Sequence, residues 1–358
     1  MAIEREGGIS RERRCRGSQA KVLMCAVLLG VAIEVPQVHA GLGTCSTDPL
    51  PFTGLFPAIE SRLSLTHFEP GQVVEIDPRT MSESAAREHI AELQKLGARV
   101  SIYLVGGHCD LGADCDSLGP EVRLGATGSW NWDKSERRVL DINHPKVMKR
   151  LADGIIGGWK LGANYIRIDN LHFPAGSSEP RTVKQMEQII DMGQEIEDLL
   201  RADGVIEPER PTGLVAHNNL LVWEELVAKK RIRRPPVLLT SERTGQLAPA
   251  DGYEGDGRMK AGRLSPADVP EIAAGGRLAR RLNVPYVIAE FGITHDLANP
   301  GRTYVTPQSY IDALAKQPGV TEVNVIPDES QYVGRGRIYK GSGPTTLAAS
   351  SACAAPRK

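Results

Sequence analysis

Residues 164–172 read NYIRIDNLH, a stretch in which two isoleucines alternate with Tyr165, Arg167 and Asp169. Apolar residues at every second position are typical of a β-strand that presents one face to a packed layer. The other face of this strand carries charges, and buried charges are costly unless they find partners. The alternation therefore predicts a strand whose isoleucines face helices, with a polar network on the other side and Asp169 as its last inward residue.

Strand and helix patterns alternate along the chain around this stretch. The expected strands cover residues 73–77, 99–105, 137–143, 164–170, 212–218, 235–242, 284–292 and 321–327. Helical patterns lie between most of them. Eight strands joined by helices predict an α/β fold, a (β/α)8 TIM barrel. A doubly wound sheet is the alternative, but no GxGxxG or phosphate-loop pattern follows any strand.

Polar side chains end most of the expected strands, where a barrel enzyme keeps its chemistry. They are Glu75, Asp77, Asp141, Asp169, Asn170, His217, Asn218, Asn219, Glu242 and Glu290. Each one alone is readily explained as an ion pair or a loop cap, whereas the set indicates a functional pocket. Two carboxyl groups across a cleft are what glycoside hydrolysis needs, one as acid and one as nucleophile or base. Trp130, Trp132 and Tyr103 are candidate surfaces for sugar rings.

Other chemistries fit the sequence less well. A serine hydrolase is disfavoured because no GxSxG motif is present. A divalent metal bound by Glu75, Asp77 and Asp141 is the remaining alternative, since hard cations prefer oxygen ligands. We expect no metal and no cofactor. The net charge of -1 gives no reason to expect nucleic acid or an anionic membrane as partner, and nothing indicates an oligomeric state.

The first forty residues are typical of an export signal. ERRCRGSQAK (12–21) is a basic region, VLMCAVLLGVAI (22–33) a short apolar core, and VPQVHA (35–40) a cleavage site before Gly41. The apolar run falls short of a spanning helix. An N-terminal core helix is the alternative. We expect a secreted or periplasmic protein with a barrel over 41–334 and a small, polar tail over 335–358 that wraps or frays.

Four cysteines remain after removal of the signal, an even number suited to an oxidising compartment. Cys109 and Cys115 share one short loop, and Cys45 and Cys353 lie at opposite ends of the chain. These two pairings are the expected disulfides, although other connectivities stay open. A zinc site is the rival interpretation, which the single CxxxxxC spacing supports weakly.

The ordered motifs resemble a known family. The run GARVSIYLVGGHCD … RRVLDINHPKVMKRLADGIIGGWKLGANYIRIDNLHF is similar to the first half of glycoside hydrolase family 114, the endo-α-1,4-polygalactosaminidases. EID, IYLVGG, VLDIN, NYIRIDN, VAHN, TSE and AEF correspond, in order, to strand motifs of that family, over about residues 73 to 327. Two departures are His217, where the family has a lysine, and the basic Arg167.

The resemblance implies a TIM barrel in which Asp169 and Glu242 are the catalytic pair, with the role of each left open. It implies that Asp77, Tyr103, Asp141, Asn218 and Glu290 line the sugar site, and we add Asn170, His217 and the two tryptophans. A pocket rich in carboxylates suits a cationic amino sugar. The resulting hypothesis is a secreted glycosidase acting on an amino-sugar polysaccharide. A barrel that binds polysaccharide without cleaving it is the alternative.

Overall fold

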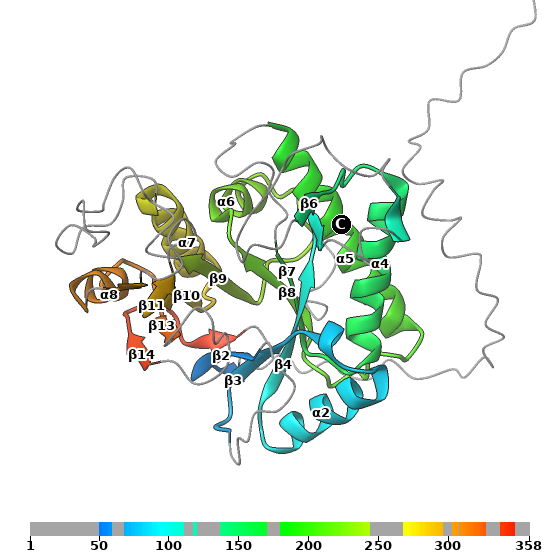
Figure 1. Cartoon of the computed structure of the whole chain (residues 1–358), viewed down its shortest axis with the longest axis horizontal. Coiled ribbons are helices and arrows are strands. Elements are labelled where there is room, and N and C mark those ends of the chain that lie inside the picture. The colour runs from blue at the N-terminus through cyan, green and yellow to red at the C-terminus, as the bar shows by residue number, and fades with distance from the viewer. Residues whose placement is uncertain are drawn as a thin grey trace, which may run out of the picture. The chain divides into compact units, whose positions relative to one another are not determined.

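Eight parallel strands form the central sheet of the computed structural model (Figure 1). In sheet order they are β2 (Gly54–Ala58), β3 (Gln72–Ile76), β4 (Arg99–Val105), β7 (Tyr165–Asp169), β8 (Gly213–His217), β9 (Leu238–Arg243), β10 (Tyr286–Phe291) and β13 (Glu322–Ile326). An antiparallel strand, β14 (Arg337–Lys340), extends the sheet beyond β13. The structure describes residues 50–58, 68–110, 117–119, 137–169, 180–243, 268–295, 303–306, 308–326 and 337–347.

Side chains of β13 join the last parallel strand to the first. The backbone N–H of Leu55 on β2 donates to Glu322 Oε1 at 3.0 Å, and Asn324 Nδ2 donates to the carbonyl of Leu55 at 2.5 Å. Both side chains are buried, with 0% of Glu322 and 1% of Asn324 exposed. These bonds bring β2 against β13, so the sheet curls round as a (β/α)8 TIM barrel, as the sequence predicted.

Helices follow the strands and pack on the outside of the sheet (Figure 1). They are α2 (Glu83–Lys95), α4 (Pro145–Lys160), α5 (Pro180–Ala202), α6 (Leu220–Ala228), α7 (Asp268–Leu282) and α8 (Gln308–Ala315). Ser82 caps α2 by accepting from the N–H of Ala85 at 3.3 Å. Gly158 lets α4 lie against β7, because a Cβ there would come within 2.5 Å of Ile166 Cδ1.

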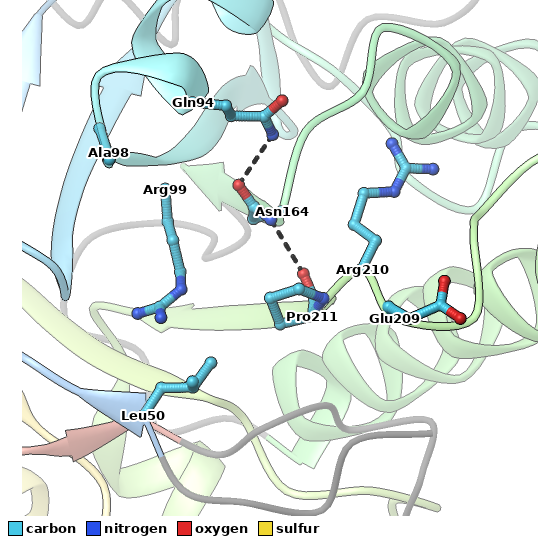
Figure 2. Close-up of a pocket in the computed structure, with 9 residues that line it drawn as sticks. Leu50, Gln94, Ala98, Arg99, Asn164, Glu209, Arg210 and Pro211 are labelled. Carbon is cyan, nitrogen blue, oxygen red and sulfur yellow. Dashed lines mark hydrogen bonds between the residues drawn. The ribbon is translucent and has the colours of Figure 1, made fainter. Parts of the chain in front are cut away.

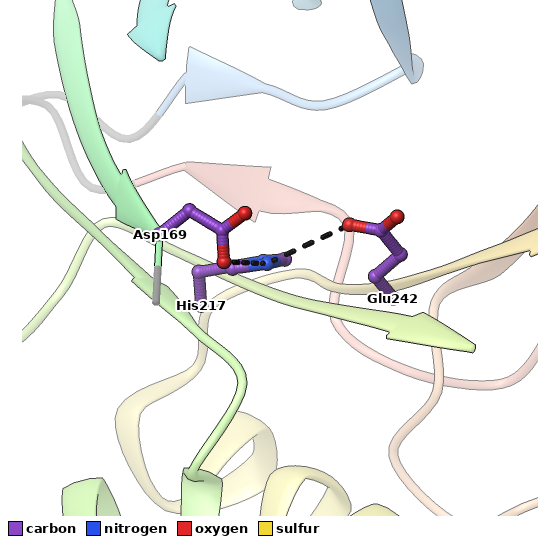
Figure 3. Close-up of side chains that lie close together, drawn as sticks. All are labelled: Asp169, His217 and Glu242. Carbon is purple, nitrogen blue, oxygen red and sulfur yellow. Dashed lines mark ion pairs between the residues drawn. The ribbon is translucent and has the colours of Figure 1, made fainter. Parts of the chain in front are cut away.

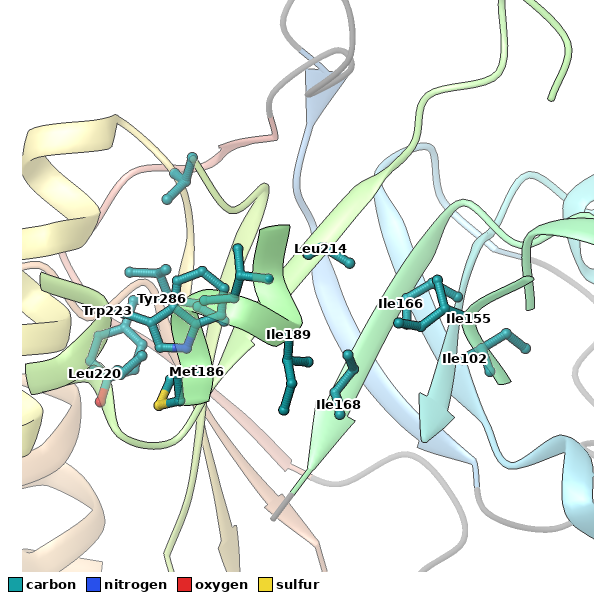
Figure 4. Close-up of a cluster of buried hydrophobic side chains, with 14 of the residues drawn as sticks. Ile102, Ile155, Ile166, Ile168, Met186, Ile189, Leu214, Leu220, Trp223 and Tyr286 are labelled. Atoms are coloured by element: carbon teal, nitrogen blue, oxygen red, sulfur yellow. The ribbon is translucent and has the colours of Figure 1, made fainter. Parts of the chain in front are cut away.

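The strands bury side chains on both faces. An outer core between sheet and helices contains Ile102, Ile166, Ile168 and Leu214, among others (Figure 4). An inner core fills one end of the barrel with Phe52, Leu55, Val73, Tyr165, Val215, Val237, Leu238, Val287 and Leu347. Burial on both faces is the expected condition of strands in a parallel barrel.

The expected strand over residues 137–143 is not a strand of the barrel. β6 (Arg137–Val139) forms an antiparallel hairpin with β5 (His108–Asp110) outside the central sheet. The eighth parallel strand is instead β2, beside β3, which the sequence pattern does not indicate because GLFPA holds a glycine and a proline. Among the described strands, β2 has a ladder only with β3, so the missing N–H of Pro57 is tolerated.

Part of the segment assigned to a polar tail belongs to the fold. Besides β14, β15 (Thr346–Leu347) pairs with β1 (Leu50–Pro51), and the fully buried Leu347 joins the inner core. The short elements η1 (Pro78–Thr80), β11 (Ile293–His295) and β12 (Thr303–Val305) complete the described set. None of the helices in the described ranges is long and apolar enough to cross a membrane.

Several predictions fall outside the described residues, namely the export signal and Cys45, Cys115 and Cys353. Cys109 is buried, with 1% of its surface exposed. Its expected partner Cys115 lies outside the described residues, so this disulfide stays a prediction.

Candidate active site

β7 carries the polar face that its sequence predicted. Tyr165 belongs to the inner core, whereas Ile166 and Ile168 belong to the outer core. In register, Arg167 lies beside Tyr103 on β4, and Asp169 lies beside Val105. Arg167 and Asp169 therefore point into the barrel, and Asp169 is the last residue of β7, at the C-terminal end of the parallel strands.

A buried ion pair lies below Asp169. Arg167 Nε lies 2.7 Å from Glu75 Oε2 on β3, and both side chains are buried. The guanidinium carbon of Arg167 also lies 4.8 Å from the centre of the Tyr103 ring, a cation–π contact. Glu75 is therefore the partner of Arg167, which the sequence alone did not identify.

Burial governs the protonation of the pair. It raises the pKa of Glu75 to about 7; the charge of Arg167 opposes this increase, while the nearby Asp169 and Glu242 add to it. Burial acts to lower the pKa of Arg167, but Glu75, Asp169 and Glu242 outweigh it and raise that pKa. Arg167 is therefore a permanent cation, and Glu75 titrates near neutral pH.

Three side chains from neighbouring strands meet above this pair: Asp169 of β7, His217 of β8 and Glu242 of β9 (Figure 3). His217 Nε2 lies 3.2 Å from Asp169 Oδ1 and 3.9 Å from Glu242 Oε2. One oxygen of each carboxylate and one ring nitrogen all lie within 4.8 Å of one another. This set, called here the rim cluster, is also the group of described residues that could hold a metal ion.

Tyr103 supports the rim cluster from β4. Its hydroxyl donates to Asp169 Oδ2 at 3.1 Å. Burial raises the pKa of Tyr103 well above its ordinary value, and the negative charge of Asp169 raises it further. The phenol therefore keeps its proton and stabilises the ionised form of Asp169.

Hydrogen bonds fix the ring of His217. Asn218 Oδ1 accepts from the backbone N–H of Glu242 at 3.0 Å, which identifies the other amide atom, Nδ2, as nitrogen. Asn218 Nδ2 lies 2.9 Å from His217 Nε2, so this ring nitrogen accepts. His217 Nδ1 lies 2.8 Å from Thr240 Oγ1 and donates to it. Arg167 Nη1 lies 3.0 Å from both ring nitrogens.

The left-handed backbone at the end of β8 makes this arrangement feasible. Asn218 and Asn219 have φ of 48° and 46°, a region that asparagine tolerates better than most residues. Asn218 thereby connects His217 to the backbone of Glu242. The sequence predicts His217 and Asn218 as site residues but not Thr240. Thr240 is marked in the sequence only by its position two residues before Glu242, on the same face of the strand.

Asp77 and Asp141, both predicted to line the pocket, make local contacts in the structure. Asp77 is buried and caps η1, binding Arg79 through Nη2 at 2.6 Å. Asp141 lies after β6, where its Oδ1 accepts from the N–H of Asn143 at 3.0 Å and stabilises the turn before α4. It therefore ends a hairpin strand and not a barrel strand.

Glu290 is buried, but its side chain lies on the face of β10 that points away from the barrel interior. In the ladder between β9 and β10, Ala289 lies beside Glu242. Since neighbours in register share a face, Ala289 points inward with Glu242, and Glu290 points outward with Ile288 of the outer core. Its expected place in the pocket is therefore wrong. Asn170, Trp130 and Trp132 lie outside the described residues.

A cavity of about 430 Å³ lies elsewhere, where β4 and β7 begin (Figure 2). Arg99, Asn164 and Arg210 line it. Gln94 Nε2 donates to Asn164 Oδ1 at 3.0 Å, and Asn164 Nδ2 donates to the carbonyl of Pro211 at 3.2 Å. This is the end of the barrel where TIM barrels keep stabilising contacts, so we place the candidate site at the rim cluster.

Two groups of solved structures have a similar fold. The glycoside hydrolase domain of PelA from Pseudomonas aeruginosa matches 81% of this chain and 98% of its own, with a TM-score of 0.53 and 14% identity. Aspergillus fumigatus Ega3, solved in complex with galactosamine, matches 87% of this chain and 100% of its own, with a TM-score of 0.50 and 12% identity. No protein-family model and no curated protein matches the sequence. The comparisons confirm the fold that the strand motifs predicted.

Proposed function

We propose that the protein is a glycoside hydrolase, similar to family 114, that cleaves an amino-sugar polysaccharide with Asp169 and Glu242. The observation that carries this proposal is the rim cluster, in which oxygens of the two carboxylates lie within 4.8 Å at the C-terminal ends of β7 and β9. Glycosidases place an acid and a second carboxylate across the scissile bond in this way. The fold shared with the PelA hydrolase domain and Ega3 supports the same reaction class.

The contacts of each carboxylate support a division of roles. Tyr103 donates to Asp169, and Arg167 provides a permanent positive charge on the same strand. These groups favour a carboxylate that stays ionised, as a nucleophile must. Glu242 is then the general acid and base. The short distance between the two groups supports a retaining mechanism, in which the carboxyl groups lie about 5–5.5 Å apart.

The substrate class follows from charge. Glu75, Asp169 and Glu242 contribute negative charge around Arg167, a field that suits a sugar bearing an ammonium group. Ega3, a protein of similar fold, was solved with galactosamine bound. A galactosamine-containing polymer is therefore the proposed substrate. Export by residues 1–40 to the periplasm or the medium, with disulfides Cys109–Cys115 and Cys45–Cys353, completes the proposal.

The test is the release of reducing ends by the chain from Gly41 onward, incubated with a partially deacetylated galactosamine polymer and a panel of other exopolysaccharides. Asp169→Asn and Glu242→Gln should each lower the rate at least ~100-fold. Asp153→Asn, on the outer surface of α4, is the matched control and should retain the wild-type rate. Saturable binding of a polymer by the wild type without any turnover would replace the hydrolase with a polysaccharide-binding barrel.

A further inference from the structure

We propose that the rim cluster is also a binding site for a divalent transition metal such as Zn²⁺, with Asp169, His217 and Glu242 as its three protein ligands. Bound metal would occupy the carboxylates that the proposed reaction uses, so it would inhibit the enzyme. Only this inhibition depends on the proposed function; the binding site itself stands on the geometry and the hydrogen bonds of the cluster.

The distances suit a small cation after a short movement. Zinc binds nitrogen and oxygen ligands at about 2.0–2.2 Å, so ligand atoms around one tetrahedral ion lie roughly 3.4 Å apart. His217 Nε2 and Asp169 Oδ1 are already 3.2 Å apart, and Glu242 Oε2 lies 3.9 Å from the same nitrogen. The three ligand atoms lie within 4.8 Å of one another, so Glu242 has to approach by about 1–1.5 Å, which a side-chain rotation supplies.

The state of the imidazole is the one that metal binding requires. The amide of Asn218 donates to His217 Nε2, so this nitrogen carries a lone pair and not a proton, and a bound metal would replace the Asn218 N–H as the partner of that lone pair. That lone pair lies 3.2 Å from an oxygen of Asp169, and two acceptors at this distance repel each other. A cation bound by both atoms removes this repulsion.

His217 Nδ1 has a hydrogen-bond acceptor, as the second ring nitrogen of a metal-binding histidine usually does. His217 Nδ1 donates to Thr240 Oγ1 at 2.8 Å, and that hydroxyl donates to the carbonyl of Ala216 at 3.5 Å. Such an outer hydrogen bond fixes the tautomer and orients the ring toward the metal. Thr240 is buried on the strand that carries Glu242, so the ring and the carboxylate are held by one element.

The charge balance favours a dication. Arg167 Nη1 lies 3.0 Å from His217 Nε2, and the carboxylate of Glu75, 2.7 Å from Arg167 Nε, offsets this positive charge. Two carboxylates and a neutral imidazole bring two negative charges to the ion. One nitrogen and two oxygens resemble the mixed sets of catalytic zinc sites, and imidazole selects Zn²⁺, Co²⁺ or Ni²⁺ over Mg²⁺ and Ca²⁺.

Calorimetric titration of chelator-treated protein with ZnCl₂ at pH 7.5 tests the site. We expect one ion per chain. Asp169→Asn, His217→Gln and Glu242→Gln should each weaken binding at least about 10- to 100-fold, the loss that follows from disturbing even an outer partner of a ligand. CoCl₂ should give a visible d–d spectrum that vanishes in His217→Gln. His89→Gln on α2 is the control and should bind like the wild type.

Separate readouts distinguish this inference from the proposed function. Zinc should abolish turnover by metal-free enzyme, and chelator should restore it. A zinc affinity that is unchanged in both His217→Gln and Glu242→Gln, with both variants folded by circular dichroism, would overturn the site even if the enzyme cleaves the polymer. One-to-one binding that all three variants lose would support the site even if no substrate is turned over.

Discussion

The guanidinium of Arg167 lies 2.7 Å from the carboxylate of Glu75, and the pair sits inside the barrel directly below Asp169. Arg167 also lies over the ring of Tyr103, whose hydroxyl donates to Asp169. The buried pair therefore supports the side chains of the rim cluster as well as neutralising charge inside the barrel.

Removing the cation of this pair should destabilise the protein. Arg167→Gln leaves Glu75 buried without its guanidinium partner, and breaking such a pair typically costs about 3–5 kcal/mol. Urea unfolding at pH 8, where Glu75 is ionised, measures the loss. Lys149→Gln is the control, because the exposed pair with Asp153 on α4 is worth less than about 1 kcal/mol. Equal stabilities of the two variants would contradict the assigned role.

The stability of the protein should depend on the protonation of Glu75. Its pKa is raised by burial from 4.5 to about 7, so between these pH values the folded state holds a proton that the unfolded state has lost. The stability from this group is present below pH 4.5 and is lost as the pH rises through about 7. The unfolding free energy of the wild type should therefore fall between pH 5 and pH 8 relative to that of Glu75→Gln.

Urea titrations at four pH values measure this difference. Glu83→Gln, which alters an exposed carboxylate at the start of α2, should follow the wild-type profile. Parallel profiles for the wild type and Glu75→Gln would show that Glu75 does not titrate in this window.

The hydroxyl of Tyr103 should contribute to turnover. Tyr103→Phe removes the donor to Asp169 and leaves the ring over Arg167 in place, so we expect kcat/KM to fall about 10-fold with a stability loss near 1 kcal/mol. Initial rates on the galactosamine polymer provide the measurement. Tyr339→Phe, which removes a hydroxyl that donates to Gln308 near the surface, should leave the rate unchanged.

Azide should reveal which carboxylate forms the covalent intermediate. In a retaining enzyme, a nucleophile variant such as Asp169→Gly is rescued by azide, which attacks the substrate directly and inverts the anomeric carbon. Glu242→Gly should instead give a glycosyl azide of retained configuration, because azide attacks the intermediate. Product configuration by NMR decides the roles, and the opposite pattern would exchange them.

The sequence predicted the parts of the fold that local patterns determine. The alternation in β7 separates Ile166 and Ile168 from Arg167 and Asp169, so both the orientation of the strand and its polar face were correct. Residues 137–143 look like a barrel strand locally, but strand partners are set by contacts distant in sequence. The same holds for β2. Pro57 makes its sequence look unlike a strand, and its contact with β13 depends on the hydrogen bond from Asn324, which is distant in sequence.

The residues of the candidate site were likewise predicted only where the local sequence pattern shows which way the side chain points. Asp169, Glu242 and His217 end strands whose inward faces the sequence indicates, and the structure brings them together. Glu290 lies one residue before the end of β10, a strand in which Ile288 and Val287 are buried apolar residues on opposite faces. No alternation marks the inward face of such a strand, so the sequence alone could not show that Glu290 points outward.

The central claim is that Asp169 and Glu242 act together on one glycosidic bond, and the kinetics of a double variant test it most directly. When two residues act as a unit, the effects of substituting them on the rate are strongly non-additive. Asp169→Asn, Glu242→Gln and their combination should each reduce the release of reducing ends from the galactosamine polymer by a similar large factor, at least ~100-fold. Near-wild-type rates in both single variants, or losses that simply multiply in the double variant, would contradict the account.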